Sequence, residues 1–234
     1  MLEDGLASGI EDGIKRIIDC LIDTFGNLTE NDAATPLSYL EFQRIRVPRQ
    51  AAWGTNLMRE NILRHISDDI GAKIESGEFQ LTMADSVRFD FMRFAIGTIH
   101  PWLARMEREI FEAVAGSSFI TTDSPVSFYN PACPPPAEAG ISLAGTIVFF
   151  PLSSRKLLLM RHPECRTSMP LTPLSEPTEQ NSTVALSYGN IWDSELVRNA
   201  NWKLARLSHE IFVADNEATL QQGELNRSDA HLHT

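Results

Sequence analysis

The feature that most constrains the fold is a change in apolar periodicity near residue 118 of the 234-residue chain. Before this point, apolar residues recur at the three-to-four-residue spacing of amphipathic helices. After it, the apolar runs are short, as in FITT, TIVFF and KLLLM, and turn-forming residues separate them. The change predicts an α+β fold, with helices dominating residues 8–115 and a small, mainly antiparallel sheet formed after residue 118.

Helical segments fill the first half of the predicted fold. A capping box at Ser8 opens an amphipathic helix, and a second capping box, Ser38 with Glu41, opens another. Pro48 should kink this second helix or split it, because proline removes a hydrogen bond from a helix interior. Beyond the proline, a stripe of isoleucines is expected to face the core: Ile62, Ile66, Ile70 and Ile74.

The remaining predicted elements are a central helix, a hairpin and a closing helix. Roughly Asp85 to Ala115 is apolar around more of its circumference than the first helix, as expected of a central helix, and Pro101 marks a break or kink in it. PLSSR predicts a hairpin connection, and a helix over Asn190 to Leu207 leads into a short strand, EIFVAD. We treat residues 1–220 as a single α+β domain and residues 221–234, which lack apolar periodicity, as a disordered tail.

Charge and cysteine content argue against several classes of function. The net charge is -11, so the field of the whole molecule repels phosphate backbones and leaves no general nucleic-acid footprint. We expect neither export nor membrane insertion, because the sequence has no signal-like segment and no long apolar run. Cys20, Cys133 and Cys165 are far apart and match no zinc or redox spacing, which is typical of reduced thiols in a cytoplasmic protein.

Familiar catalytic motifs do not occur in the chain. There is no Walker loop, GxGxxG, HExxH, GxSxG or paired CxxC, which argues against most nucleotide-binding, metalloprotease and serine-hydrolase classes. The six histidines show no ligand spacing except for the pair in the tail, His231 and His233. Candidate functional residues therefore come from weaker signals.

The first such signal is Asp123-Ser124-Pro125, which ends the strand-like run FITT. A carboxylate at the end of a strand can act as a base or bind a divalent metal, and Ser124 beside it can donate to the same ligand. The alternative is an Asx-turn, in which Asp123 accepts hydrogen bonds from its own neighbouring backbone.

Two helices supply further polar candidates. Gln43, Arg46 and Gln50 fall on one helical face, with Arg49 nearby. A guanidinium there can bind an anion bidentately, although a solvated face has the same spacing. Asn199 and Asn201 lie in the last helix, where asparagine is unfavourable. A specific partner for one of them would explain its position, with surface exposure as the alternative.

Together these pieces resemble one family, the uncharacterised and mostly bacterial proteins grouped as domain of unknown function 4238. LASGIEDGIKRI is similar to its acidic helix, FQRIRVPRQ to its Gln-Arg-Pro-Arg segment, and IVFFPLSSRKLLL to its Pro-Leu hairpin. FITTDSPV is similar to its strand ending in Asp, Asn or Ser and then Pro, and Asn201 falls where that family carries an asparagine in the closing helix. The resemblance runs over nearly the whole chain, but it names positions and no reaction.

The resemblance also implies a segment ahead of the acidic helix, with His, Pro and a Tyr-Leu-Arg-like stretch. This sequence does not contain that segment, so we expect it to correspond to a truncated member of the family. If the segment supplies a catalytic histidine, the chain is expected to be an inactive remnant.

Two functions remain open, one enzymatic and one not. In the first, Asp123 and Ser124 face Arg46 and Asn201 across a hydrolase-like pocket for an anionic or phosphate-bearing ligand. The carboxylate of Asp123 should then lie within roughly 4–8 Å of Arg46, Arg49 or Asn201. In the second, the chain is a non-catalytic interaction protein with an unknown protein partner, and the Asp-Ser-Pro segment is a structural turn.

Overall fold

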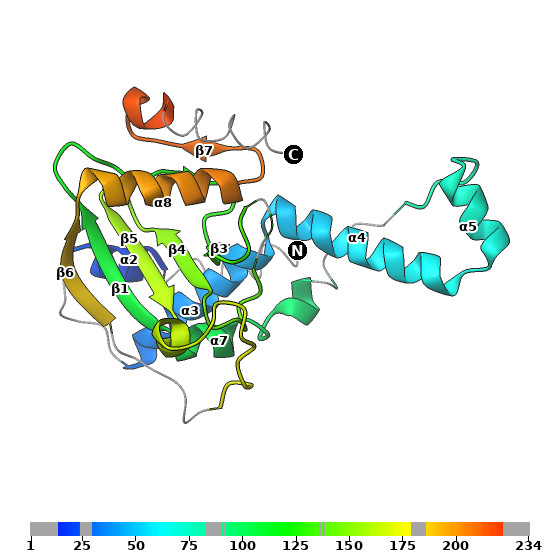
Figure 1. The fold of residues 1–234 in the computed structure, drawn as a ribbon, viewed down its shortest axis with the longest axis horizontal. Coiled ribbons are helices and arrows are strands. Elements are labelled where there is room, and N and C mark those ends of the chain that lie inside the picture. Colours follow the sequence, from blue (N-terminus) through cyan, green and yellow to red (C-terminus); the bar gives the residue numbers. More distant parts are fainter. Residues whose placement is uncertain are drawn as a thin grey trace.

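The computed structural model describes most of the chain, and its fold is α+β, as predicted (Figure 1). The capping box at Ser8 and nearly all of the predicted tail lie outside the described residues. The described residues are 14–23, 30–82, 90, 92–135, 137, 139–178 and 186–221.

A five-stranded sheet forms the centre of the molecule, in the order β3-β4-β5-β1-β6. Neighbouring strands run antiparallel, except that β1 and β6 run parallel. The sheet is therefore mixed but mainly antiparallel. Its strands are β1 (Glu107–Ala113), β3 (Ser127–Tyr129), β4 (Ile147–Pro151), β5 (Lys156–Arg161) and β6 (Leu186–Trp192).

A smaller sheet lies beside the first. Its strands are β2 (Thr121–Thr122) and β7 (Phe212–Val213), which pair antiparallel. This pairing joins the chain just before Asp123 to the chain that follows helix α8 (Ser194–Leu207). The strand prediction for EIFVAD is thereby confirmed, as is the PLSSR hairpin, which connects the antiparallel neighbours β4 and β5.

The prediction of a helix continuing to Ala115 is wrong. Helix α7 (His100–Arg105) ends early, and Glu107–Ala113 form β1, a seven-residue strand inside the sheet. Ile110 packs in the apolar cluster on one face of the sheet, and Phe111 packs in the cluster on the other face. Because both faces of β1 are covered, its apolar residues do not alternate and they fit a helical spacing equally well. The sheet accordingly begins before residue 118.

Helices cover both faces of the sheet (Figure 1). Helices α2 (Ile14–Asp23), α3 (Glu30–Ile45) and α7 share an apolar cluster with one face, where Leu40 and Met160 are almost completely buried. Helix α8 (Ser194–Leu207) shares a second cluster with the other face. Removing such apolar surface from water stabilises the fold by about 25 cal/mol per Å².

The predicted capping box at Ser38 is wrong. Helix α3 begins at Glu30, so Ser38 lies inside the helix. The carboxylate of Glu41 is buried and binds the N-terminus of another helix, α7. Its Oε1 accepts hydrogen bonds from the backbone N–H groups at the start of α7, those of Gly97 (2.9 Å), Ile99 (2.8 Å) and His100 (3.0 Å).

The closing helix also begins later than predicted. Asn190 to Trp192 belong to β6, and α8 begins at Ser194. Asp193 is its N-cap, because the side chain accepts from the backbone N–H groups of Glu195 and Leu196, each at 2.9 Å. This is the usual role of an aspartate at that position.

Both prolines mark breaks between helices, as predicted, and each lies in the first turn of the helix that follows the break. Pro48 opens α4 (Pro48–His65), and Pro101 is in the first turn of α7. Helices α4 and α5 (Asp68–Glu75) project away from the sheet and its covering helices (Figure 1). The prediction that an isoleucine stripe there faces the core is wrong, because α5 has no buried residue and Ile70 is 43% exposed. Helical spacing identifies an apolar face but not what covers it.

None of the helices in the described part of the chain combines the length and apolar character needed to cross a membrane.

Candidate functional site

Asp123 connects two segments that are far apart in the chain. Its Oδ1 accepts from the backbone N–H of His209 (2.8 Å), and its Oδ2 accepts from the N–H groups of Glu210 (2.6 Å) and Ile211 (3.0 Å). Its own N–H donates to the carbonyl of Ile211 at 3.0 Å. The carboxylate therefore holds the segment directly after α8, an arrangement that neither sequence hypothesis anticipated.

These contacts also act on the protonation of Asp123. Burial raises the pKa of its carboxyl, but the backbone hydrogen bonds from Glu210, His209 and Ile211 outweigh burial and leave the pKa below its ordinary value. A carboxylate whose charge is stabilised in this way is a weak proton acceptor.

Ser124 is completely buried beside it. Its N–H donates to the Thr122 hydroxyl at 3.0 Å, and its carbonyl accepts from the Ser127 hydroxyl at 2.8 Å. Its own Oγ is buried and has no hydrogen-bond partner among the described residues. A ligand in solvent does not reach this hydroxyl in the conformation of the structure.

Asn201 of α8 binds the same segment from its other end. The side chain is buried, its Oδ1 accepts from the N–H of Ile120 (3.1 Å), and its Nδ2 donates to the carbonyl of Ser118 (2.8 Å). The side-chain amide thus forms the backbone hydrogen bonds that a neighbouring strand would otherwise form with this segment. This specific role explains why an asparagine lies inside a helix. The structure brings Asp123 and Asn201 to one segment, residues 118–123.

The arginine cluster is not arranged as the sequence predicted. Helix α3 ends at Ile45 and α4 begins at Pro48, so Gln43 and Arg46 do not share one continuous helical face. Gln43 is buried, whereas Arg46 is exposed with its guanidinium 5.3 Å from the centroid of the Phe42 ring. The side chain of Arg49 lies outside the described part of the structure.

Arg44, which the sequence argument passed over, is the arginine that reaches the Asp123 region. It is buried, its Nη1 donates to the carbonyl of Val126 (3.2 Å), and its guanidinium stacks 4.4 Å from the centroid of the Phe128 ring. Val126 follows the Asp-Ser-Pro segment directly. No sequence signal distinguished Arg44 from Arg46, because burial depends on where α3 packs.

A polar pocket opens beside Asn201, between the first half of α8, the loop after β1 and the segment after β7. It has a volume of about 250 Å³. We call it the α8 pocket. Its charge comes from Arg198, which is exposed, and its other polar lining residues are Ser117, Ser118, Ser194, Asn201, Asn216 and Thr219.

A hydrogen-bonded network fixes one wall of the α8 pocket. The Ser118 hydroxyl donates to Asp215 Oδ1 (2.6 Å), and Asn216 Nδ2 donates to the same oxygen (2.6 Å) and to the Ser118 hydroxyl (3.0 Å). The Thr219 hydroxyl lies 3.0 Å from that of Ser118. The hydrogen bond from Ser118 is the main reason that the pKa of Asp215 lies below its ordinary value. Asp215 is therefore unsuited to activating Ser118 as a nucleophile.

A second cavity, of about 290 Å³, lies over β1, β5 and β6, and two of its three arginines form ion pairs with its two glutamates. Arg161 lies 3.6 Å from Glu107 and 3.5 Å from Glu109, and Arg166 lies 3.9 Å from Glu107. Two carboxylates of this lining would therefore face an anionic ligand, whereas Arg198 is the charged residue among those lining the α8 pocket.

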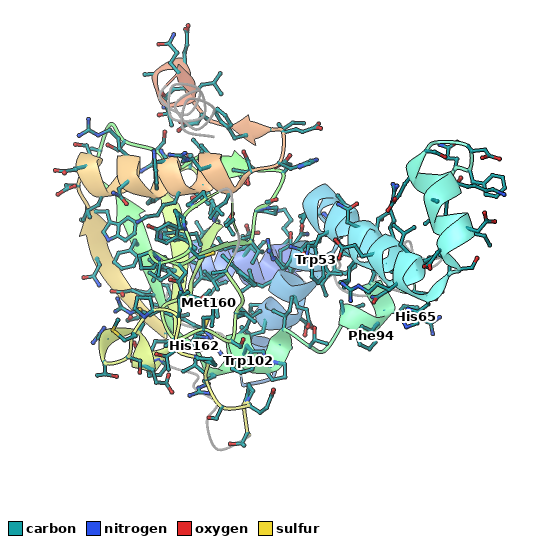
Figure 2. The ribbon with its side chains drawn as sticks, turned by 45° about the vertical axis from the view of Figure 1, so that its right-hand side comes forward. Trp53, His65, Phe94, Trp102, Met160 and His162 are labelled. Atoms are coloured by element: carbon teal, nitrogen blue, oxygen red, sulfur yellow. The ribbon has the colours of Figure 1, made fainter. Side chains whose placement is uncertain are left out.

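A buried histidine, His162, lies at the other end of the sheet, beside a tryptophan and an ion pair. His162 is fully buried, its Nε2 lies 2.7 Å from the carbonyl of Ile141, and its ring meets Trp102 edge to face at 6.2 Å (Figure 2). Nε2 must carry the proton, because a carbonyl only accepts. The Nδ1 of His162 is buried without a hydrogen-bond partner among the described residues. Next to it, Arg105 forms an ion pair with Glu164.

His162 could not be selected from the sequence, because an isolated histidine after a strand carries no spacing signal. Burial lowers its pKa below the ordinary value, and the nearby Arg105 adds to this effect, although the Ile141 carbonyl opposes it. Among the residues that the structure describes, no group of three or more His, Cys, Asp and Glu side chains is placed to hold a metal ion.

The fold and the pocket define an α+β protein with a polar, ligand-sized cavity on the helix that covers one face of its sheet. Residues 1–210 match the family described as "Protein of unknown function (DUF4238)", and the chain belongs to this family. The resemblance inferred from the sequence is confirmed. No curated protein and no solved structure matches the chain.

Proposed function

We propose that this protein binds a small anionic ligand, such as a phosphate monoester, in the α8 pocket. The observation that carries the proposal is the lining of that pocket, where the Arg198 guanidinium lies among serine hydroxyls, the buried amide of Asn201 and the exposed amide of Asn216. A guanidinium binds phosphate and carboxylate oxygens through charge-assisted, often bidentate hydrogen bonds, and hydroxyl groups can donate to the same oxygens.

The charge of Arg198 matters because backbone N–H donors at the N-terminus of α8 are already hydrogen-bonded to the side chain of Asp193. The side chain of Asp193 takes the backbone N–H groups of Glu195 and Leu196, so these donors of α8 are not available to a ligand. An anion in the pocket would instead depend on Arg198 and on the hydroxyls of Ser117 and Ser194.

The contacts of Asp123 and Ser124 support a structural role for this pair, and hence binding without hydrolysis. The carboxylate is occupied by three backbone donors, and the hydroxyl is buried. A catalytic role for Asp123 and Ser124, with or without a divalent metal, stays a prediction. It would require the segment after α8 to move away from the carboxylate.

Calorimetric titration of the purified chain tests the proposal. Inorganic phosphate, glucose 6-phosphate and adenosine monophosphate serve as probes, with glucose and adenosine as uncharged counterparts. We expect at least one phosphate compound to bind and Arg198→Ala to weaken its binding at least about tenfold, which corresponds to about 1.4 kcal/mol.

Arg93→Ala is the matched control, because Arg93 is also an exposed arginine and lies outside the pocket. This substitution removes the same charge from the molecule and should leave binding unchanged. Equal weakening by both substitutions would mean that the net charge of the molecule, and not a specific contact with Arg198, determines binding. Absence of binding by all three phosphate compounds at millimolar concentration would contradict the proposal.

A further inference from the structure

The projecting part of the molecule, residues 48–82, exposes large apolar side chains away from the core. We call it the arm; it contains α4 and α5. Both views show it extending away from the sheet and its covering helices (Figures 1 and 2). The side chains of Leu57, Ile70 and Phe79 are 39%, 43% and 47% exposed, and Trp53 on the same helix as Leu57 is 55% exposed.

Exposing these apolar side chains to water is unfavourable in free energy for a monomer. Each large apolar side chain gains about 1.5–3 kcal/mol when it is fully buried, so several of them on one extended element favour association. Phe94, which follows the arm in the sequence, is 80% exposed and adds to the exposed apolar surface of the molecule; Figure 2 labels it beside His65, the last residue of α4.

The charges of the two arm helices are opposite. Helix α4 contains three arginines and one glutamate, which leaves it net positive by 2 with histidine neutral. Helix α5 contains two aspartates, one glutamate and one lysine, which leaves it net negative by 2. The arm therefore carries a positively charged helix and a negatively charged helix, whose charges are complementary.

A second copy of this chain offers a negative helix to the positive α4 and a positive helix to the negative α5 at the same time. In a two-fold symmetric pair, any contact of one copy's α4 with the other's α5 occurs twice, so both positive helices meet negative ones. Electrostatic complementarity of this kind selects the partner, while burial of the apolar side chains supplies affinity. A chain with a net charge of -11 needs such a local match to overcome its overall self-repulsion.

We propose that the arm is the dimerisation element of this protein, and that two copies associate through it with α4 of each facing α5 of the other. The proposal is independent of the α8 pocket, because none of the residues lining that pocket lies in the arm.

Sedimentation velocity of the full chain from low to high micromolar concentration gives the first test. The expected species has twice the 26.1 kDa mass of the chain. Leu57→Asp and Ile70→Asp should each shift the protein to monomer, because each places a charge in the apolar contact. Circular dichroism and thermal unfolding show whether these variants remain folded, which is expected because both sites are exposed.

Charge exchange gives the sharper test. Arg59→Glu with Arg64→Glu makes α4 net negative by 2, and Asp69→Lys with Glu75→Lys makes α5 net positive by 2. Each double variant alone then pairs like charges and should be monomeric. An equimolar mixture restores an attractive contact at both places and should form a heterodimer.

Lys15→Glu is the control, because it reverses an exposed charge on α2, away from the arm, and should leave the dimer intact. A wild-type chain that stays monomeric would overturn the proposal, and it would leave the arm to a different partner. Dimers that survive both double variants would place the interface elsewhere. Two monomeric variants that fail to combine would exclude the pairing of α4 with α5.

Discussion

At the residue scale, Asp123 and Asn201 hold one segment, residues 118–123, from two sides. Asn201 satisfies the backbone at Ser118 and Ile120, and Asp123 takes three N–H groups of the chain after α8. Each side chain thus replaces hydrogen bonds that a wider sheet would have supplied. A buried or partly buried backbone group left without a partner costs about 1–3 kcal/mol, so both residues should matter for stability.

Replacing Asp123 tests this role. We expect Asp123→Asn to lower the free energy of unfolding by about 1–3 kcal/mol, because the charge is lost and the amide nitrogen faces N–H donors. Urea denaturation at neutral pH measures the change. Asp193→Asn is the matched control, since asparagine caps a helix as well as aspartate does, and it should change stability little. Equal effects of the two substitutions would contradict a special role for Asp123.

At the scale of elements, the position of α7 depends on a residue in α3. The carboxylate of Glu41 is buried and receives the N–H groups of Gly97, Ile99 and His100. Carboxylates at this end of a helix satisfy its unpaired donors and interact favourably with its dipole. α7 leads directly into β1, so this contact also helps to position a strand inside the sheet.

Glu41→Gln is expected to destabilise the protein by about 1–2 kcal/mol, because the amide oxygen still accepts but the charge assistance is lost. Thermal unfolding measures the loss, and Glu78→Gln, which changes an exposed glutamate in the same way, should leave stability nearly unchanged. Hydrogen exchange at Ile99 and His100 should accelerate in Glu41→Gln. Unaltered exchange there would mean that α7 keeps its position without the carboxylate.

At the scale of the whole molecule, stability should depend on pH through a histidine deep in the structure. His162 is fully buried, and its pKa is lowered chiefly by burial. The unfolded chain binds a proton at a histidine near pH 6.5, whereas the folded chain binds it only at lower pH. Between these two values the unfolded state holds more protons, so stability falls as the pH falls below about 6.5.

The contribution of His162 is measurable by urea denaturation between pH 7.5 and pH 5. We expect the wild-type chain to lose stability over this range and His162→Gln to lose less of it, because glutamine does not titrate. His65→Gln is the control, since His65 is exposed on α4 and should leave the slope unchanged. A slope that is identical in wild type and His162→Gln would show that other groups cause it.

Local chemistry determined several features that the sequence already predicted. Pro48 and Pro101 lie in first turns because a helix needs no backbone N–H donor there and the fixed φ of proline suits that position. The PLSSR connection forms a hairpin because two apolar runs on either side of a short turn pair most easily with each other. The α+β class likewise followed from the change in period.

Only the tertiary structure decided what the remaining residues contact. The strand β1 looked helical because apolar layers cover both of its faces, and a sequence does not show what lies opposite a side chain. The isoleucines of the arm looked like core residues for the same reason. Asp123 could be selected as a residue of interest, but its partners lie on a segment 86 to 88 residues away. Periodicity and turn chemistry act within a few residues, whereas burial and long-range hydrogen bonds depend on how distant segments pack.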